Sequence, residues 1–558
     1  MITQKGLRQG AVLKKFVLEA HPIIQTYIEK LKIPDLIATY ILQDQRLKLP
    51  IEHSLCVLIH NILTTPMPMY EIGAWLAPLD ENSLGLTRSE AQCIHDDRMG
   101  QALERFYQGR HKDVFFHLAL RAIKLFQLEC SQIHQDTTTV TFSGKYAGWS
   151  VPELLSHGIN KDHRPDLKQL VLGLSVSADG SVPLVHKIYS GNQTDDRLHP
   201  ENHRRLCQLL QRTDFIYVAD CKLATEENLR RIGTYGGRFV SVMPRTWNQD
   251  ALFRQRVTEG KVQWDRLLSR RNNRKPGSQI DQYYLARGNY QAKDYRLLWI
   301  KSSQKAQQDA QSRARCLAKA LGALNALQTR LNRYTLKSRE AIDLAVAKVL
   351  QEHTVESLID CRIDSQQVSQ RSYSKRGRPS LRQKGRLTWT TQFSLSFEEN
   401  QQAIQQQSLT DGVFPLITNL DPTAYSAKKV LEIYKFQPFL EKRHSQIKTW
   451  QQVTPVLLKK DERVVAYLHM HVMALTVATL IERQLRKAMR RRGLSALPLY
   501  PEQRPCPYPT MFDIVRVFRG VERYEVSHAE NAALFPASLT PLQKQLLEML
   551  EVPLSLYQ

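Results

Sequence analysis

The sequence predicts an α/β protein of several domains, in which a helical region precedes an α/β core and a mixed α/β domain interrupts that core. The chain has 558 residues, and single hydrophobic cores stop growing at about 250–300 residues. Residues 1–128 carry apolar side chains at three- and four-residue spacing, which favours helices. Residues 131–243 change to β-branched runs that alternate with helical segments, which favours a sheet with connecting helices.

The first region, residues 1–128, is expected to be a helical DNA-binding domain. Helices are predicted at residues 16–31, 51–63, 98–107 and 114–128. Residues 47–63 are a candidate part of a helix-turn-helix motif. Periodicity alone fits a plain packing domain equally well, so both interpretations stay open.

One acid, Asp136, lies inside the stretch SQIHQDTTTVTFSGKY at residues 131–146. Thr and Val at this density favour a strand. A carboxylate on a buried strand is costly unless a metal ion or a cation pairs with it; the alternative is a surface-facing Asp on an edge strand. His134 lies two residues earlier on the same face, either as a metal ligand or only as a hydrogen-bonding group.

The region 129–243 is predicted to contain the first part of the core. Further strands are expected at 170–177, 184–189, 215–219 and 238–242, with helices at 197–211 and 225–234. The resulting order, β-β-β-α-β-α-β, is that of a ribonuclease-H-like core. Asp220 directly follows the strand 215–219, and an acid at the carboxyl end of a strand faces the crevice where α/β sheets bind ligands.

Residues 244–410 are predicted to form the inserted domain. Paired strands are expected at 283–287 and 296–302, long helices at 304–333 and 336–352, and another strand at 387–397. The segment SKRGRP at 374–379 contains Arg376 and Arg378, which are candidates for a minor-groove contact or for a solvated loop. The tryptophans of this region are either core or surface residues or stack on a base near the cleavage point; they are Trp247, Trp264, Trp299 and Trp389.

Residues 411–480 return to a core-like pattern and 481–558 form a basic C-terminal region. A strand is predicted at 413–418, helices at 427–436, 439–449 and 541–550, and a buried apolar helix at 464–480. The basic side chains of 481–492 either contact phosphates or are solvated. Tyr434, Glu441 and Lys448 are spaced by seven, so one continuous helix would place them near one face. Pro438 is tolerated only in a first helical turn, and a helix beginning near Gln437 would leave Tyr434 outside it.

The net charge limits the class of partner. The chain has 78 Lys and Arg against 54 Asp and Glu, which gives +24 and a pI near 9.6. Such an excess is typical of proteins that bind nucleic acid or anionic surfaces. The eight cysteines include no C-x-x-C pair, which fits a reducing cytoplasm, and we expect neither a signal peptide nor a membrane span.

Asp136, Asp220 and Glu441, with the segments around them, resemble the bacterial insertion-sequence transposases that have an Asp-Asp-Glu triad. The resemblance is to the subgroup with the signature Y-x2-R-x3-E-x6-K in particular. Tyr434, Glu441 and Lys448 match that signature in register, and Gln437 replaces its Arg. Supporting segments are HDDRMG (95–100), HQDTT (134–138), HGINKDHRPD (157–166), GNQTD (191–195) and VAD (218–220). The resemblance covers most of the chain and is weakest over 244–410 and after residue 490.

The resemblance implies a transposase that cleaves DNA at element ends and joins the freed ends to target DNA. It implies that Asp136, Asp220 and Glu441 hold two Mg²⁺ ions, with Mn²⁺ as a substitute, since hard cations prefer oxygen ligands. The expected DNA contacts are Tyr434, Gln437, Lys448, Arg376 and Arg378.

Further expectations concern the binding partners of the protein and the alternatives to a transposase function. The expected partners are double-stranded DNA and a second copy in a homodimeric synaptic complex, without a membrane, in the bacterial cytoplasm. Because Gln437 lacks a charge, Gln437→Arg is expected to tighten end binding. The rival functions are a metal-dependent nuclease of the same fold and a DNA-binding relative that has lost catalysis.

Overall fold

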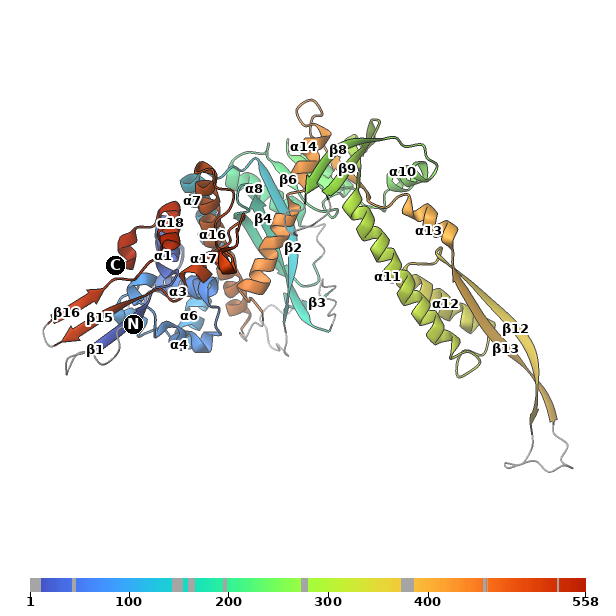
Figure 1. The fold of residues 1–558 in the computed structure, drawn as a ribbon, viewed down its shortest axis with the longest axis horizontal. Helices are drawn as coiled ribbons and strands as arrows, with labels where there is room; N and C mark the ends of the chain where they lie inside the picture. The colour runs from blue at the N-terminus through green and yellow to red at the C-terminus, as the bar shows by residue number, and fades with distance from the viewer. Residues whose placement is uncertain are drawn as a thin grey trace. The chain divides into compact units, whose positions relative to one another are not determined.

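The computed structural model describes residues 12–42, 47–142, 154–158, 166–193, 198–271, 280–372, 386–454, 458, 460–528 and 531–558. They belong to two compact units, drawn in Figure 1. Unit 1 consists of residues 1–241 and 430–558, and unit 2 of residues 242–429. Unit 2 is therefore an insertion between two parts of unit 1, and the region 481–558 belongs to unit 1.

The first part of unit 1 is mainly helical. Its helices are α1 (His21–Lys30), α2 (Ile33–Tyr40), α3 (Ile51–Thr64), α4 (Ile72–Leu76), α5 (Arg88–Ala91), α6 (Asp96–Gln108) and α7 (His111–Phe126), with the 3₁₀ turns η2 (Met69–Glu71) and η3 (Glu81–Leu84). The helices predicted at 51–63, 98–107 and 114–128 are confirmed. The helix predicted at 16–31 is wrong at its start, because Phe16 lies on strand β1 (Val12–Val17), which pairs with β15 (Glu522–His528).

The helix α3 does not present a DNA-reading face. Every side chain from Ser54 to Thr64 is buried, and the helix packs against α2, α6 and α16 (Asp461–Arg491). A recognition helix must offer exposed side chains to the bases of a groove. The helix-turn-helix interpretation of residues 47–63 is therefore wrong for this helix, and the packing interpretation applies.

Unit 1 contains a sheet with the strand order β3-β4-β2-β6-β7, and β5 pairs with β4. The strands are β2 (Gln132–Phe142), β3 (Ser156–His157), β4 (Lys168–Ser177), β5 (Pro183–Ser190), β6 (Ile216–Val218) and β7 (Arg238–Val242), and the connecting helices are α8 (His199–Leu210) and α9 (Glu226–Thr234). The pairs β2–β4 and β4–β5 are antiparallel, whereas β2–β6 and β6–β7 are parallel. Each strand predicted from the sequence is present in the predicted order, and the short β3 is additional.

The second part of unit 1 is organised around α16. The preceding segments are α14 (Ala427–Tyr434), α15 (Gln437–Ser445) and the π-helical turn η5 (Gln446–Trp450), and the following ones are η6 (Pro501–Gln503), α17 (Met511–Phe518), β15, β16 (Asn531–Phe535), α18 (Pro541–Leu550) and η7 (Leu554–Tyr557). α16 contacts α1, α3, α6, α7 and α18. Its length and composition would also allow it to cross a membrane, but 94% of its apolar window is buried inside the protein. This burial is that of a core helix, as the sequence predicts.

The basic residues at the end of α16 differ in their environments: Arg483 is buried, whereas Arg490, Arg491 and Arg492 are exposed. Arg483 is 6% exposed and forms an ion pair with Asp179. Arg486 pairs with Glu482 at 2.9 Å, and Arg492 pairs with Glu548 at 2.8 Å. Neither interpretation of the 481–492 cluster holds for Arg483 and Arg486, which pair with carboxylates of unit 1, whereas both interpretations stay open for the exposed Arg490, Arg491 and Arg492.

Unit 2 contains a small antiparallel sheet, a helical pair and a long two-stranded ribbon (Figure 1). Its elements are α10 (Asn248–Thr258), β8 (Trp264–Arg271), β9 (Ile280–Ala286), β10 (Tyr290–Ala292), β11 (Tyr295–Ser302), α11 (Ser303–Gln328), α12 (Arg339–His353), β12 (Ile359–Ser372), β13 (Arg386–Glu399), α13 (Gln401–Ser408) and β14 (Val413–Thr418). The predicted pairing of 283–287 with 296–302 is confirmed by β9 and β11. The strand β12, which pairs with β13, was not predicted.

The tryptophans of unit 2 have different environments. Trp299 is 1% exposed and stacks on Phe253, with ring centroids 3.9 Å apart. Trp264 meets the same Phe253 ring edge-on, and Trp247 precedes α10 as its N-cap residue. Trp389, on β13, is 69% exposed. Trp299 is therefore a core residue, whereas Trp389 remains accessible to a partner.

Buried histidines should make unit 1 sensitive to acid. His186 and His469 are buried, with Nε2 of His186 2.5 Å from Nδ1 of His469. Burial lowers the pKa of His186 to about 3 and that of His469 well below its ordinary value. The unfolded chain takes up these protons near pH 6.5, so the folded state binds fewer protons below that pH. The free energy of unfolding should be highest above about pH 6.5. It should fall between about pH 6.5 and pH 3, by about 1.4 kcal/mol per pH unit for each histidine.

Denaturant unfolding between about pH 7.5 and about pH 5 measures this effect. The midpoint should fall as the pH decreases, and His186→Phe should reduce the slope because the variant has one fewer titrating side chain. A midpoint that stays constant over this range would contradict the prediction.

Candidate active site in unit 1

The first candidate acid, Asp136, lies in the middle of β2. Its side chain is 15% exposed, and Oδ1 accepts a hydrogen bond from the Thr137 backbone N–H at 2.8 Å. Nδ1 of His444, on α15, lies 3.5 Å from Oδ2. Asp136 is therefore half-buried between its own strand and α15.

The second candidate acid, Asp220, follows β6 at its carboxyl end. Its Oδ1 accepts from the Lys222 backbone N–H at 3.0 Å, and its backbone carbonyl accepts from the Ser241 hydroxyl at 2.7 Å. β2 and β6 are parallel neighbours, with His134 opposite Val218. Asp136 and Asp220 each come two residues after this pair, which is the last of the two strands. Both acids therefore follow the carboxyl end of the β2–β6 pairing.

The third candidate acid, Glu441, is exposed on α15. Gln437, Glu441 and His444 follow i, i+4, i+7 spacing and so share one face of that helix. Gln437 and His444 both contact β2. Glu441 lies between these two contacts, on the side of α15 that faces the strand of Asp136.

The phenol of Tyr434 has a pKa that is affected by all three candidate acids. The pKa of Tyr434, at the end of α14, is raised first by burial and then by the charges of Asp220, Cys221, Glu441 and Asp136. The charges of all three candidate acids therefore oppose ionisation of the Tyr434 phenol. The three carboxylates do not form a closed group in this structure: within the described residues, the only three His, Cys, Asp or Glu side chains whose ligand atoms all lie within 4.8 Å are His95, Asp96 and Asp97.

The signature residues do not lie on one continuous helix. α14 ends at Tyr434, α15 begins at Gln437 with Pro438 in its first turn, and Lys448 lies half-buried in η5. Pro438 lacks a backbone N–H, so it can begin a helix but cannot continue one. The single-helix argument for spacing by seven is therefore wrong, and the contacts of α15 with β2 position Glu441 instead.

Gln437 is not placed to contact DNA. It is 8% exposed, its Oε1 lies 3.1 Å from Nδ1 of His134, and its Nε2 donates to the Gln135 carbonyl at 3.0 Å. His134 is fully buried, and this burial lowers its pKa to about 4. A neutral His134 that donates from Nδ1 satisfies this network, which favours the hydrogen-bonding interpretation of His134. The expected contact of Gln437 with phosphate is corrected: Gln437 attaches the start of α15 to β2.

Gln437→Ala is expected to reduce cleavage by about 10–100-fold, the usual cost of losing an outer partner of a metal site. The variant removes both bonds to β2, so α15 can shift relative to Asp136 while the DNA-binding surface is unchanged. Cleavage as a function of Mg²⁺ concentration, measured beside DNA affinity, tests this. Gln437→Arg should also lower cleavage, because a guanidinium cannot reproduce the bond from His134; tighter DNA binding with full cleavage would contradict this account.

Buried charges fix the other end of α15. Arg443 is 3% exposed, and its Nη1 lies 2.6 Å from Oε2 of Glu482 and 2.6 Å from Oε1 of Gln446. Its Nη2 donates to the Gly180 carbonyl at 2.7 Å. Burial opposes the charged form of Glu482, but Arg443 and Arg486 bring its pKa down to about 2. α15 is thus held to β2 at its start and to α16 at its end.

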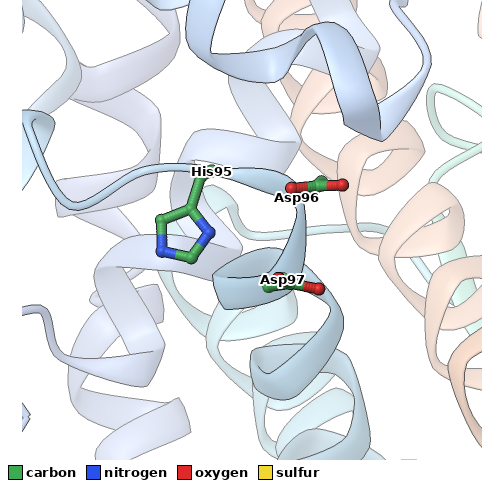
Figure 2. A group of neighbouring side chains, drawn as sticks. All are labelled: His95, Asp96 and Asp97. Atoms are coloured by element: carbon green, nitrogen blue, oxygen red, sulfur yellow. The ribbon is translucent and has the colours of Figure 1, made fainter.

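His95, Asp96 and Asp97 form the start of α6, as Figure 2 shows. Nδ1 of His95 accepts from the Arg98 backbone N–H at 3.4 Å and so caps the helix. The two acids lie in the first turn, where negative charge is favourable. All three are exposed, and helix capping accounts for them without a metal ion.

Two sets of candidate residues lie outside the described residues: Arg376 and Arg378, and residues 159–165 of the HGINKDHRPD segment. One residue that the sequence interpretation missed is His444, beside Asp136. Its spacing of three from Glu441 was the available signal, because such residues share a helix face.

Residues 14–120 match a family described as a domain of unknown function, DUF4277. No curated protein matches the chain. Among solved structures, the chain is similar to the piggyBac transposase in its cryo-EM synaptic complex with hairpin DNA, with 7% identity and a TM-score of 0.38, over 91% of this chain and 81% of that one. A likeness at this level supports no conclusion about fold or function.

Proposed function

We propose that this protein is a DNA transposase that cleaves DNA at the ends of its element and joins the freed ends to target DNA. The observation that carries the proposal is that α15, which bears Glu441, contacts β2, which bears Asp136, and that β6, which leads to Asp220, is the parallel neighbour of β2. Three acids from two neighbouring parallel strands and a helix agree with the resemblance of the sequence. A chain charge of +24 suits a polyanionic substrate.

The donor set fits Mg²⁺, or Mn²⁺ in its place. Asp136, Asp220 and Glu441 offer carboxylate oxygens, which are the ligands hard cations prefer, and neither a Cys nor a His cage is needed. When bound, such ions activate a water or hydroxyl nucleophile and stabilise the leaving oxygen of a phosphodiester. His444 orients Asp136 from α15, and Gln437 holds α15 to the strand of Asp136.

The remaining candidate site residues are proposed to bind and position DNA. The phenol of Tyr434 is protonated at neutral pH, as an ordinary tyrosine is, and is proposed to donate a hydrogen bond to a phosphate near the acids. Lys448 supplies a positive charge from η5, and Arg376 and Arg378 contact DNA from unit 2. The working form is a homodimer that brings two element ends together, in the bacterial cytoplasm and without a membrane.

An assay with labelled DNA distinguishes this function from its rivals. The substrate carries the repeats that flank the coding sequence, and both cleavage and joining to a target plasmid are measured with Mg²⁺ or Mn²⁺. Cleavage followed by joining supports a transposase, and cleavage without joining indicates a nuclease. Binding without any cleavage indicates a relative that has lost catalysis.

A further inference from the structure

The positive charge of the chain is concentrated in unit 2. Residues 242–429 contain 32 Lys and Arg and 16 Asp and Glu, a net charge of +16. The rest of the chain contains 46 Lys and Arg and 38 Asp and Glu, a net charge of +8. Unit 2 is the smaller unit and carries two thirds of the net charge, so it has the higher charge density.

A short segment of unit 2, the basic turn (residues 330–337), gathers this charge at the surface. It connects α11 to α12 and contains Arg330, Arg333 and Lys337, all exposed. None of the three forms an ion pair with an acid of the described ranges of the chain. Tyr334, between them, is 84% exposed. These cations contrast with Arg483 and Arg486 of unit 1, which pair with carboxylates.

The basic turn is attached to the ribbon β12–β13. The Asn332 side chain donates to the Phe393 carbonyl at 2.8 Å and accepts from the Phe393 N–H at 2.8 Å. Gln328, at the end of α11, donates to the Leu395 carbonyl at 2.8 Å. These bonds hold the basic turn to the inner part of the ribbon.

The ribbon continues beyond this attachment without support from other elements. Residues 387–392 of β13 are all exposed, including Leu387 at 52% and Trp389 at 69%. β12 and β13 pair only with each other among the described strands, so no third described strand covers either edge of the ribbon. An isolated two-stranded ribbon is marginally stable in water, and one with an exposed Trp gains from a partner that covers it.

We infer that the basic turn and the outer ribbon of unit 2 form a docking surface for double-stranded DNA, with the turn on the phosphates and Trp389 against the sugar-phosphate edge. The inference rests on the proposed function for the nature of the partner. Unneutralised cations, an exposed tyrosine and an exposed tryptophan on one body match a polyanion that also has apolar sugar and base surfaces. Two-stranded ribbons are of a size that fits a DNA groove.

The test measures the affinity of the full chain for duplex DNA at several salt concentrations. The variant Arg330→Gln/Arg333→Gln/Lys337→Gln removes three charges that neutralise phosphates, so the slope of log K against log salt should become shallower by about 2 to 3. Trp389→Ala should weaken binding at every salt concentration and leave the slope unchanged, because it releases no counterions.

The matched control removes three exposed charges from unit 1, with Arg230→Gln/Arg519→Gln/Lys544→Gln. It has the same net charge as the unit 2 variant and should keep the slope of the unaltered chain. Equal slopes for the two triple variants, both folded by circular dichroism, would overturn the inference while the unaltered chain still binds DNA. If the unaltered chain does not bind duplex DNA at all, the proposed function fails instead.

Discussion

Asp136→Asn is expected to abolish metal-dependent cleavage while DNA binding is kept. The substitution preserves the shape of the side chain and removes the negative charge that a divalent cation requires. The loss should exceed the roughly 10–100-fold that follows loss of an outer partner of a metal site. Since Asp136 is half-buried on a central strand and accepts the Thr137 N–H through Oδ1, an amide can retain that bond, and folding should be preserved.

Three further variants make this result specific. Asp220→Asn and Glu441→Ala should have the same effect, because Asp220 follows the strand next to that of Asp136 and Glu441 lies on the helix that contacts the strand of Asp136. Glu432→Ala changes an exposed acid on α14 and should leave cleavage unchanged. Full cleavage by Asp136→Asn, or equal losses from Glu432→Ala, would remove the basis for the three-acid site.

The sheet of unit 1 and several helices could be predicted because their signals are local. The run of Thr and Val around Asp136 gives β2, and an alternation of apolar runs with helical segments gives the order of the remaining strands. α18 and β14 begin and end at the predicted residues. β1 could not be predicted, because its partner strand lies near the other end of the chain. β12 is polar on both faces towards its tip, so no alternation marks it.

The candidate site was only partly accessible from the sequence. Asp136 and Asp220 follow from the strand pattern, because each lies on or directly after a strand. The position of Glu441 required tertiary contacts, since the helix break before Pro438 separates Tyr434, on α14, from Glu441, on α15. From the sequence alone, the buried Gln437 and the paired Arg483 and Arg486 cannot be distinguished from exposed polar residues. Only the partner that each side chain meets in space distinguishes the two cases.

Glu482→Ala is expected to cost about 3–5 kcal/mol of folding stability, the usual result of removing one partner of a buried ion pair. Glu482 is 0% exposed, and its carboxylate pairs with Arg443 at 2.6 Å and Arg486 at 2.9 Å. Its Oε1 also accepts from the Met511 N–H at 3.0 Å. Without Glu482, the guanidinium of Arg443 stays buried with an uncompensated charge.

Denaturant unfolding of the full chain measures this loss, and Glu227→Ala is the control because it breaks an exposed pair with Arg231. The control should leave the midpoint unchanged.

The pH dependence gives an independent check. The pKa of Glu482 is about 2 in the folded state and near 4.5 when unfolded, so its stabilisation is present above pH 4.5 and is lost as the pH falls towards 2. Glu482→Ala should lack that part of the acid transition. Because Arg443 also holds the end of α15, the variant should lose cleavage under conditions in which it is still folded; a stable Glu482→Ala protein with full cleavage would show that this network does not position Glu441.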